Sequence, residues 1–214
     1  MKRLLVLRPE PGNRATVERA LEMRLDAVPC PLFAVEAVKW TAPALHADFI
    51  LYTSANALRH GGDQLASLTA LDALAVGPAT ADAARAAGFR VVMTGDEGVD
   101  ALLEALPNKR RLLHLAGRDH RPPSTRHIVE TVAVYRSVVL QAATIPSGRL
   151  VALVHSPRAG ARLAILASDR ARISIAAISA AAAAACGTSW ASLDGADQPT
   201  DPALLALAAR LCQD

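Results

Sequence analysis

The sequence predicts an α/β fold made of two similar parallel-sheet lobes. Short apolar runs with strand character alternate with helical runs, which is typical of a parallel sheet covered by helices on both faces. The stretch DFILYTSANAL at residues 48–58 is echoed by VALVHSPRAG at residues 151–160. A common spacing between the two halves indicates a tandem duplication of a unit of roughly a hundred residues.

The spacing is the same at three pairs of landmarks. Each pair is 102 residues apart: Ser54 and Ser156, Gly77 and Ser179, and Leu102 and Leu204. The first strand of each copy, RLLVL at residues 3–7 and RLLHL at residues 111–115, is offset by 108 instead. The second copy is therefore about six residues shorter than the first between its initial strand and the later landmarks.

The first copy begins with a buried strand at residues 3–7, closed by Arg8-Pro9. Asn13 is expected to cap a helix that runs to about Arg24. The following elements are expected as an extended piece at 32–38, a strand at 49–52, a helix at 58–68, a strand at 74–76, an alanine-rich helix ending at Gly88, a strand at 90–93 and a helix at 100–106.

The second copy begins with the strand at residues 111–115. A Pro/Ser turn at residues 122–124 favours a helix over 125–130, followed by an extended piece at 132–140. The apolar strand beginning at Val151 then leads to Ser156 and the next helix.

Composition excludes several classes of function. The chain has 214 residues, 3% aromatic residues and a net charge of +3. It has neither the stacking platform nor the basic block that nucleic-acid binding needs, so no nucleic-acid partner is expected. It lacks a P-loop lysine motif, a GxGxxG and a GxSxG elbow, so nucleotide binding and triad hydrolysis are unsupported.

Cysteine usage and hydropathy predict a cytoplasmic chain. Three scattered cysteines form neither an even disulfide framework nor a CxxC motif. The first apolar run is too short for a signal peptide, and the polyalanine run at residues 180–185 is too short to cross a bilayer. No membrane partner is expected, and a monomer is the default.

Candidate binding residues follow strands at points where helices begin. They are Ser54, Ala55, Asn56, Gly77, Thr80, Ser156, Pro157 and Ser179. The carboxyl ends of parallel strands share one sheet edge, where free backbone N–H groups of helix starts favour an anion. We expect a crevice there that prefers carboxylates or phosphates, although each residue alone could be an ordinary helix cap.

The order of several short motifs resembles the uroporphyrinogen-III synthase family. These motifs are RLLVLRP at the start, DFILYTSANAL, LAVGPATADAARAAGF, and VAVYRSV before the second strand that ends in Ser-Pro. The likeness covers nearly the whole chain; it is strongest over residues 48–88 and around Tyr135, and weak after about Ser179.

The resemblance implies two α/β lobes joined by a two-stranded connector, with a cleft between the lobes. One lobe would hold residues 1–32 and 142–214 and the other residues 33–141. The connectors would lie near 32–38 and 132–140. The first strand and helix of each copy would then pack with the later part of the other copy.

The reaction implied is the cyclisation of hydroxymethylbilane to uroporphyrinogen III, with inversion of ring D and loss of water, without a cofactor. The electron-rich pyrrole expels its hydroxyl to give an azafulvene, which attacks ring D at its substituted position. The spiro intermediate fragments and recloses. Closure without inversion is the easier course, so the task is mainly one of orientation.

The resemblance also implies roles for particular residues. Tyr135, on a connector, would be the catalytic residue whose phenol helps the hydroxyl leave as water. The alternative is a structural tyrosine that packs the connector with its hydroxyl in solvent. Thr80 and Ser54 would line the cleft through hydrogen bonds. Arg8 and Arg118 would attract carboxylates, or equally form surface ion pairs.

The second copy departs from the family pattern at Ala182, where a threonine is expected. This departure leaves a second class of function open, a non-catalytic bilobed module that binds a tetrapyrrole or another small polyanion.

The histidines lack a metal-like spacing on one element, so no metal site is expected. His155, beside Ser156, is the histidine that could reach the cleft.

Overall fold

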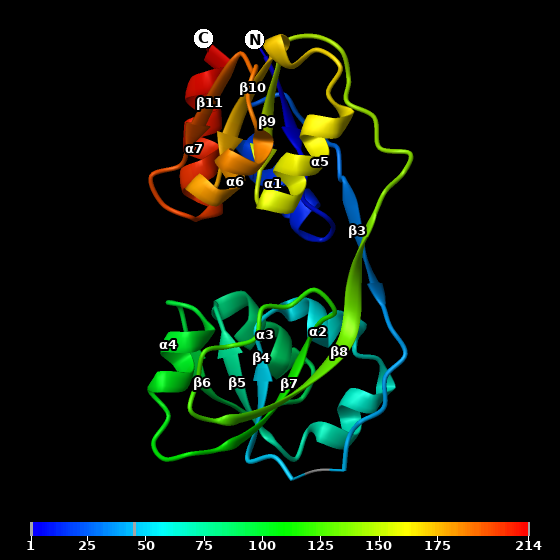
Figure 1. The fold of residues 1–214 in the computed structure, drawn as a ribbon, viewed down its shortest axis with the longest axis vertical. Helices are drawn as coiled ribbons and strands as arrows, with labels where there is room; N and C mark the ends of the chain where they lie inside the picture. The colour runs from blue at the N-terminus through cyan, green and yellow to red at the C-terminus, as the bar shows by residue number, and fades with distance from the viewer. Residues whose placement is uncertain (1, 45, 214) are drawn as a thin grey trace. The chain divides into compact units, whose positions relative to one another are not determined.

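The chain folds into two compact α/β units, each around its own sheet (Figure 1). The computed structural model describes residues 2–44 and 46–213. Unit 1 consists of Met1–Ala34 with Val139–Asp214, and unit 2 consists of Val35–Val138. The chain leaves unit 1 near Ala34 and returns to it near Val139.

Unit 1 has a parallel sheet with the strand order β11-β10-β9-β1-β2. Its elements are β1 (Arg3–Val6), α1 (Gly12–Glu22), β2 (Ala27–Pro29), β9 (Leu150–Val154), α5 (Pro157–Leu166), a 3-10 turn (Arg170–Arg172), β10 (Ile173–Ala177), α6 (Ala180–Cys186), β11 (Ser192–Gly195) and α7 (Asp201–Gln213).

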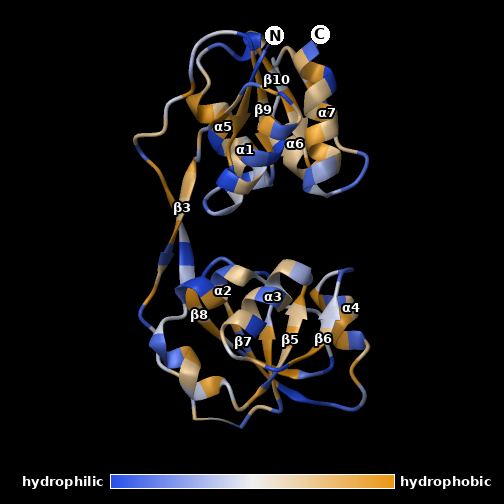
Figure 2. Ribbon diagram, turned by 180° about the vertical axis from the view of Figure 1, so that it is seen from behind, coloured by the Kyte–Doolittle hydropathy of each residue, from blue (hydrophilic) through white to orange (hydrophobic). Residues whose placement is uncertain are grey.

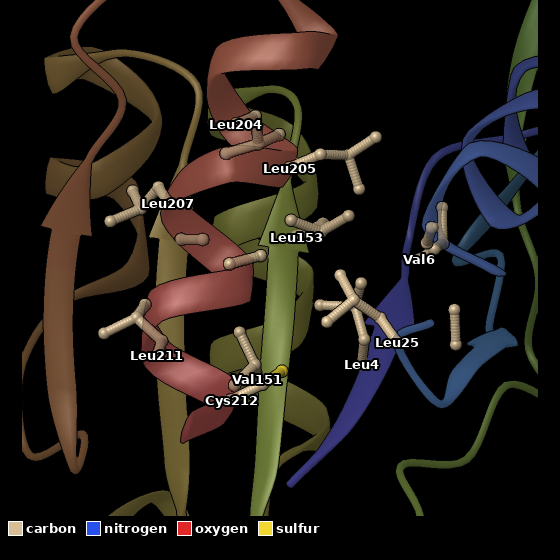
Figure 3. Packing of buried hydrophobic residues seen from close by; sticks show 14 residues of the cluster. Leu4, Val6, Leu25, Val151, Leu153, Leu204, Leu205, Leu207, Leu211 and Cys212 are labelled. Atoms are coloured by element: carbon tan, nitrogen blue, oxygen red, sulfur yellow. The ribbon is translucent and has the colours of Figure 1, made fainter. Parts of the chain in front are cut away.

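Alternate residues of the unit 1 strands enter two apolar cores. On one face, Leu4 and Val151 pack with α1 and α7, and Figure 3 shows the α7 residues Leu204, Leu205, Leu207 and Leu211 lying over the strands. On the other face, Leu5 and Ala152 pack with α5 and α6. Every residue of β9 is buried, because helices cover both faces of this central strand.

Unit 2 has the strand order β3-β8-β7-β4-β5-β6. Its elements are β4 (Phe49–Tyr52), α2 (Ala55–His60), a 3-10 helix (Asp63–Leu68), β5 (Asp72–Val76), α3 (Pro78–Ala86), β6 (Val91–Gly95), α4 (Val99–Glu104) and β7 (Arg111–Gly117), with β3 (Phe33–Ala37) and β8 (Ile128–Val139) at the sheet edge. Apolar strands and amphipathic helices give both units the same hydropathy pattern (Figure 2).

The strands β3 and β8 form the predicted two-stranded connection. The N–H of Val38 donates to the carbonyl of Val134 (3.0 Å), and that of Leu140 donates to the carbonyl of Leu32 (3.0 Å). Residue numbers rise along one strand as they fall along the other, so the pair is antiparallel. β8 also pairs with β7 in parallel, which ties the connection into the unit 2 sheet.

The two sheets have matching topologies, as a duplication predicts. The order β11-β10-β9-β1-β2 corresponds strand by strand to β6-β5-β4-β7-β8. In unit 1 the early strand β1 pairs with the late strand β9, and in unit 2 the first strand of the second copy, β7, pairs with β4. Each copy therefore contributes its first strand to the sheet of the other copy. The predicted α/β class with parallel sheets is confirmed.

The prediction of a helix over residues 125–130 is wrong, because β8 begins at Ile128. His127 is buried and its side chain bonds two backbone groups: Nδ1 accepts from the N–H of Arg110 (3.1 Å), and Nε2 donates to the carbonyl of Leu103 (2.8 Å). Arg126 donates to the carbonyl of Leu106 (2.6 Å). These bonds satisfy carbonyls at and just beyond the end of α4 and hold the segment extended.

Two smaller expectations also differ. The helix expected over 58–68 begins at Ala55, ends at His60 and is followed by a separate 3-10 helix, because Gly61-Gly62 interrupts it and Gly62 has a φ of +68°. Asn13 does not cap α1. Its buried amide donates to the carbonyls of Val6 (2.6 Å) and Arg8 (2.9 Å) instead.

The short strands β2 and β11, which lie at the two edges of the unit 1 sheet, were not anticipated. Across the part of the chain that the structure describes, the helices are too short or too polar to cross a bilayer.

A polar cluster around Asp201 joins α7 to α1 and to the segments that follow β1 and β9. Its carboxylate, at the start of α7, accepts from His155 Nε2 (2.7 Å), from Thr16 Oγ1 (3.1 Å) and from Arg19 and Arg8. Burial opposes ionisation, but the hydrogen bond and charge of His155, with Arg19 and Thr16, outweigh it and lower the pKa of Asp201 to about 2.

We predict that Asp201→Asn destabilises unit 1. A carboxylate with a depressed folded-state pKa contributes stability that is complete above about pH 4 and is lost as the pH falls toward 2. In urea titrations at pH 7, the free energy of unfolding should fall by about 2 kcal/mol. The difference between the variant and the original chain should vanish in acid.

The control is Asp26→Asn, which removes an ion pair with Arg3 whose two side chains are 59% and 50% exposed. Such a pair contributes little, so stability should hardly change. Equal effects of the two substitutions would contradict the role given to Asp201.

Candidate functional site

The carboxyl edge of the unit 2 sheet carries the first group of predicted residues. β4 ends at Tyr52, and Ser54 is the N-cap of α2, where its hydroxyl accepts from the N–H of Asn56 (3.2 Å). Ala55 is buried beneath this turn, and Asn56 Oδ1 accepts from Arg59 (3.2 Å). Ser54 is thus fixed in position by the helix that follows it.

The neighbouring strand β5 ends at a second helix start. Gly77 has a φ of +82°, a conformation that favours glycine, and a Cβ there would meet no atom within 4 Å. Its backbone is therefore open to approach by a ligand. Thr80 lies in the first turn of α3 with its side chain 6% exposed. Because β4 and β5 are parallel neighbours, Ser54 and Gly77 belong to the same edge.

Unit 1 repeats this arrangement. Ser156, followed by the exposed Pro157, caps α5 and accepts from the N–H of Ala159 (3.2 Å). Ser179 caps α6 and accepts from the N–H of Ala182 (3.3 Å). β9 and β10 are parallel neighbours, so the two serines share the carboxyl edge of the unit 1 sheet.

The capping serines keep a donor for a ligand. A hydroxyl has one O–H and two lone pairs, and each cap bond uses a lone pair only. The O–H of each cap can therefore donate to a carboxylate at the same edge. Ala182 is fully buried, and Ser179 stands at the helix start where the first copy has Gly77.

Tyr135 lies at the same end of the unit 2 sheet, on β8. It pairs with Gly117, the last residue of β7, at a register shift. Its half-buried ring covers this glycine so closely that a Cβ on Gly117 would lie 2.7 Å from Cε2. The centroids of the Tyr135 and His60 rings lie 6.3 Å apart.

The two arginines have different surroundings. Arg8 donates to Asp201 and Thr16 (3.4 Å each), so its charge is already used inside unit 1. Arg118 is exposed, and its backbone N–H donates to the carbonyl of Tyr135 (2.8 Å). His155 Nε2 donates to Asp201 (2.7 Å).

Sequence reasoning missed a group of histidines beside Tyr135. His114 Nε2 lies 3.0 Å from the hydroxyl of Thr53, just after β4, and His120 Nδ1 lies 3.0 Å from the carbonyl of Gly117. Burial, aided by the charge of His120, lowers the pKa of His114 to about 4, so its imidazole is neutral at pH 7. The sequence signal is the pair of histidines in HLAGRDH, residues 114–120, at the end of a strand pattern.

Comparison with known proteins decides the family. The family model described as uroporphyrinogen-III synthase HemD matches residues 14–206. The chain belongs to the uroporphyrinogen-III synthase family. This match spans both units and nearly all of the elements described above, and no curated protein sequence matches the chain.

Solved uroporphyrinogen-III synthases share the fold. The enzyme of Helicobacter pylori has a TM-score of 0.69 at 15% identity, over 99% of this chain and 100% of its own. A mutant of the Thermus thermophilus synthase has a TM-score of 0.54 at 18% identity, over 100% of both chains. Uroporphyrinogen-III synthases are lyases of haem biosynthesis that act on a tetrapyrrole, and the family gives this chain the same activity.

We predict that Gly117→Ala displaces the Tyr135 ring and slows turnover. The added Cβ would lie 2.7 to 3.1 Å from three atoms at the far end of that side chain, which must move. The formation of uroporphyrinogen III should slow by about tenfold or more, since small misplacements at a reacting centre are costly.

Gly195→Ala is the matched control, because a Cβ there meets nothing within 4 Å and the strand backbone is ordinary. Its turnover should equal that of the original chain. Unchanged turnover in Gly117→Ala would separate the Tyr135 ring from the reaction.

Proposed function

We propose that this chain is a cofactor-independent uroporphyrinogen-III synthase that binds a linear tetrapyrrole through residues at the carboxyl edges of its sheets. The observation that carries the proposal is the set of capped helix starts with spare hydroxyl donors, at Ser54, Ser156 and Ser179. Hydroxymethylbilane carries eight carboxylates, which suit donors of this kind. Ala55, Asn56, Gly77, Thr80 and Pro157 complete the proposed binding residues.

Orientation is the main catalytic device in this proposal. Uncatalysed closure gives the type I isomer, so the protein must hold ring D where the azafulvene carbon meets its substituted position. Donors fixed by helix backbones serve this purpose because they do not reorganise when the substrate binds. Arg118 supplies a positive charge beside this edge. Arg8 contributes less, because Asp201 already neutralises it.

Tyr135 is the proposed catalytic residue. Its phenol donates to the departing hydroxyl while the pyrrole nitrogen lone pair expels it, and water leaves. The proton that the pyrrole ring loses at the final closure replaces the one that the phenol gave up. The net reaction is therefore the loss of one water. The position of its ring over Gly117, at the end of β7, supports this role.

Tyr135→Phe should lower the rate of uroporphyrinogen III formation from enzymatically generated hydroxymethylbilane by about 10²-fold, the low end for a lost proton donor. The chain has one other tyrosine, and it is the control. Tyr52 is fully buried and its hydroxyl has no partner.

Tyr52→Phe removes only that unpaired hydroxyl, so turnover should be unchanged and stability equal or higher. Full activity in Tyr135→Phe would remove Tyr135 from the proposed role.

The carboxylate-binding role of Ser54 can be separated from its capping role. Asp and Asn both cap helices well, so Ser54→Asp and Ser54→Asn should keep the thermal midpoint near that of the original chain. Aspartate would place a negative charge against the substrate carboxylates, whereas asparagine would not.

We therefore expect KM for hydroxymethylbilane to rise at least about tenfold more in the aspartate variant, about 1.4 kcal/mol of repulsion. The excess should shrink in high salt. Equal KM values in the two variants would show that no carboxylate lies near Ser54.

We further propose that the chain acts in the cytoplasm as a monomer, with residues 33–141 as one folding domain and residues 1–32 with 142–214 as the other. The absence of activity with retained tetrapyrrole binding would favour the alternative, a non-catalytic binding module.

A further inference from the structure

One peptide group joins His120 to Tyr135. The carbonyl of Gly117 lies 3.0 Å from His120 Nδ1, and the N–H of the following residue, Arg118, donates to the carbonyl of Tyr135 (2.8 Å). These two groups belong to the same Gly117–Arg118 peptide. Since a carbonyl can only accept, His120 must carry its proton on Nδ1.

The His120 ring is held from a second side by His114. The ring centroids are 5.6 Å apart with the planes at 90°. His114 is anchored by Thr53, just after β4, and lies 3.5 Å from Thr131 Oγ1 on β8. His120 therefore contacts Gly117 and His114 of β7, and His114 is in turn held by Thr53, just after β4, and by Thr131 on β8.

The Gly117–Arg118 peptide is also the surface on which Tyr135 rests. The tyrosine ring covers Gly117 at distances that leave no room for a Cβ. Rotation of this peptide would break the hydrogen bond from Arg118 N–H to the carbonyl of Tyr135. It would also tilt the surface on which the tyrosine ring lies. Hydrogen bonds in such a chain polarise and strengthen one another, so the His120 bond also supports the bond to Tyr135.

We propose that His120 is a positioning residue for the synthase reaction, which acts on Tyr135 through the Gly117–Arg118 peptide. This inference rests on the function proposed for Tyr135. It requires a donor at the Nδ1 position of His120 and does not require the ring to exchange a proton with the substrate.

The test is a comparison of His120→Ala, His120→Asn and Tyr135→Phe, alone and combined, with turnover measured as uroporphyrinogen III formed from enzymatically generated hydroxymethylbilane. Alanine removes the donor, and kcat should fall about tenfold with little change in KM. Asparagine keeps an N–H near the Nδ1 position and should recover most of the loss. In the Tyr135→Phe background, His120→Ala should add less than about twofold, because residues that act through one group are not additive.

Controls separate this role from folding and from the proposed function. His46 is exposed, so turnover of His46→Ala should match that of the original chain. Thermal midpoints identify any variant that fails to fold.

The proposal is overturned if the turnover of His120→Ala is within twofold of the original chain, or if His120→Asn is as slow as His120→Ala. It is also overturned if the losses of turnover at His120 and Tyr135 multiply. Full activity in Tyr135→Phe would overturn both this inference and the role of Tyr135, whereas a slow Tyr135→Phe with an active His120→Ala would overturn the inference alone.

Discussion

The structure depends on the burial of its parallel strands on both faces. β9 has every residue buried, and residues 50–52 of β4 are likewise buried. Strands of this kind cannot carry polar side chains along their length, since unpaired polar groups in such a core are costly. Polar chemistry is therefore displaced to the strand ends, where helices begin and their first N–H groups need partners. The serine caps meet this need and leave donors at the edge.

Duplication and strand exchange determine which residues share an edge. β7 opens the second copy but lies beside β4 of the first, so Gly117 comes next to residues that precede it by about sixty positions. β8 then passes beside β7 and brings Tyr135 to the same edge. Tyr135 therefore comes from a connecting strand, while the hydroxyl donors come from the duplicated strand-to-helix turns.

Residue patterns predicted much of this arrangement. Apolar runs ending in Ser54 and Ser156 gave the central strands and their caps, because both signals are local. The helix expected at 125–130 failed because His127 and Arg126 bond the carbonyls of Leu103 and Leu106, contacts that a local pattern does not reveal. The pairing of Arg8 with Asp201 and of His120 with Gly117 was also invisible, the first because 193 residues separate the partners and the second because it needs the backbone path after β7.

The central claim is that the fold directs the closure of a linear tetrapyrrole toward the inverted product. The most direct measurement is the isomer composition formed when the purified chain receives enzymatically generated hydroxymethylbilane and the products are oxidised and separated. With the chain in excess, uroporphyrinogen III should be the dominant product and should decline toward the spontaneous type I isomer as the chain is diluted. Type I alone at every concentration would contradict the account.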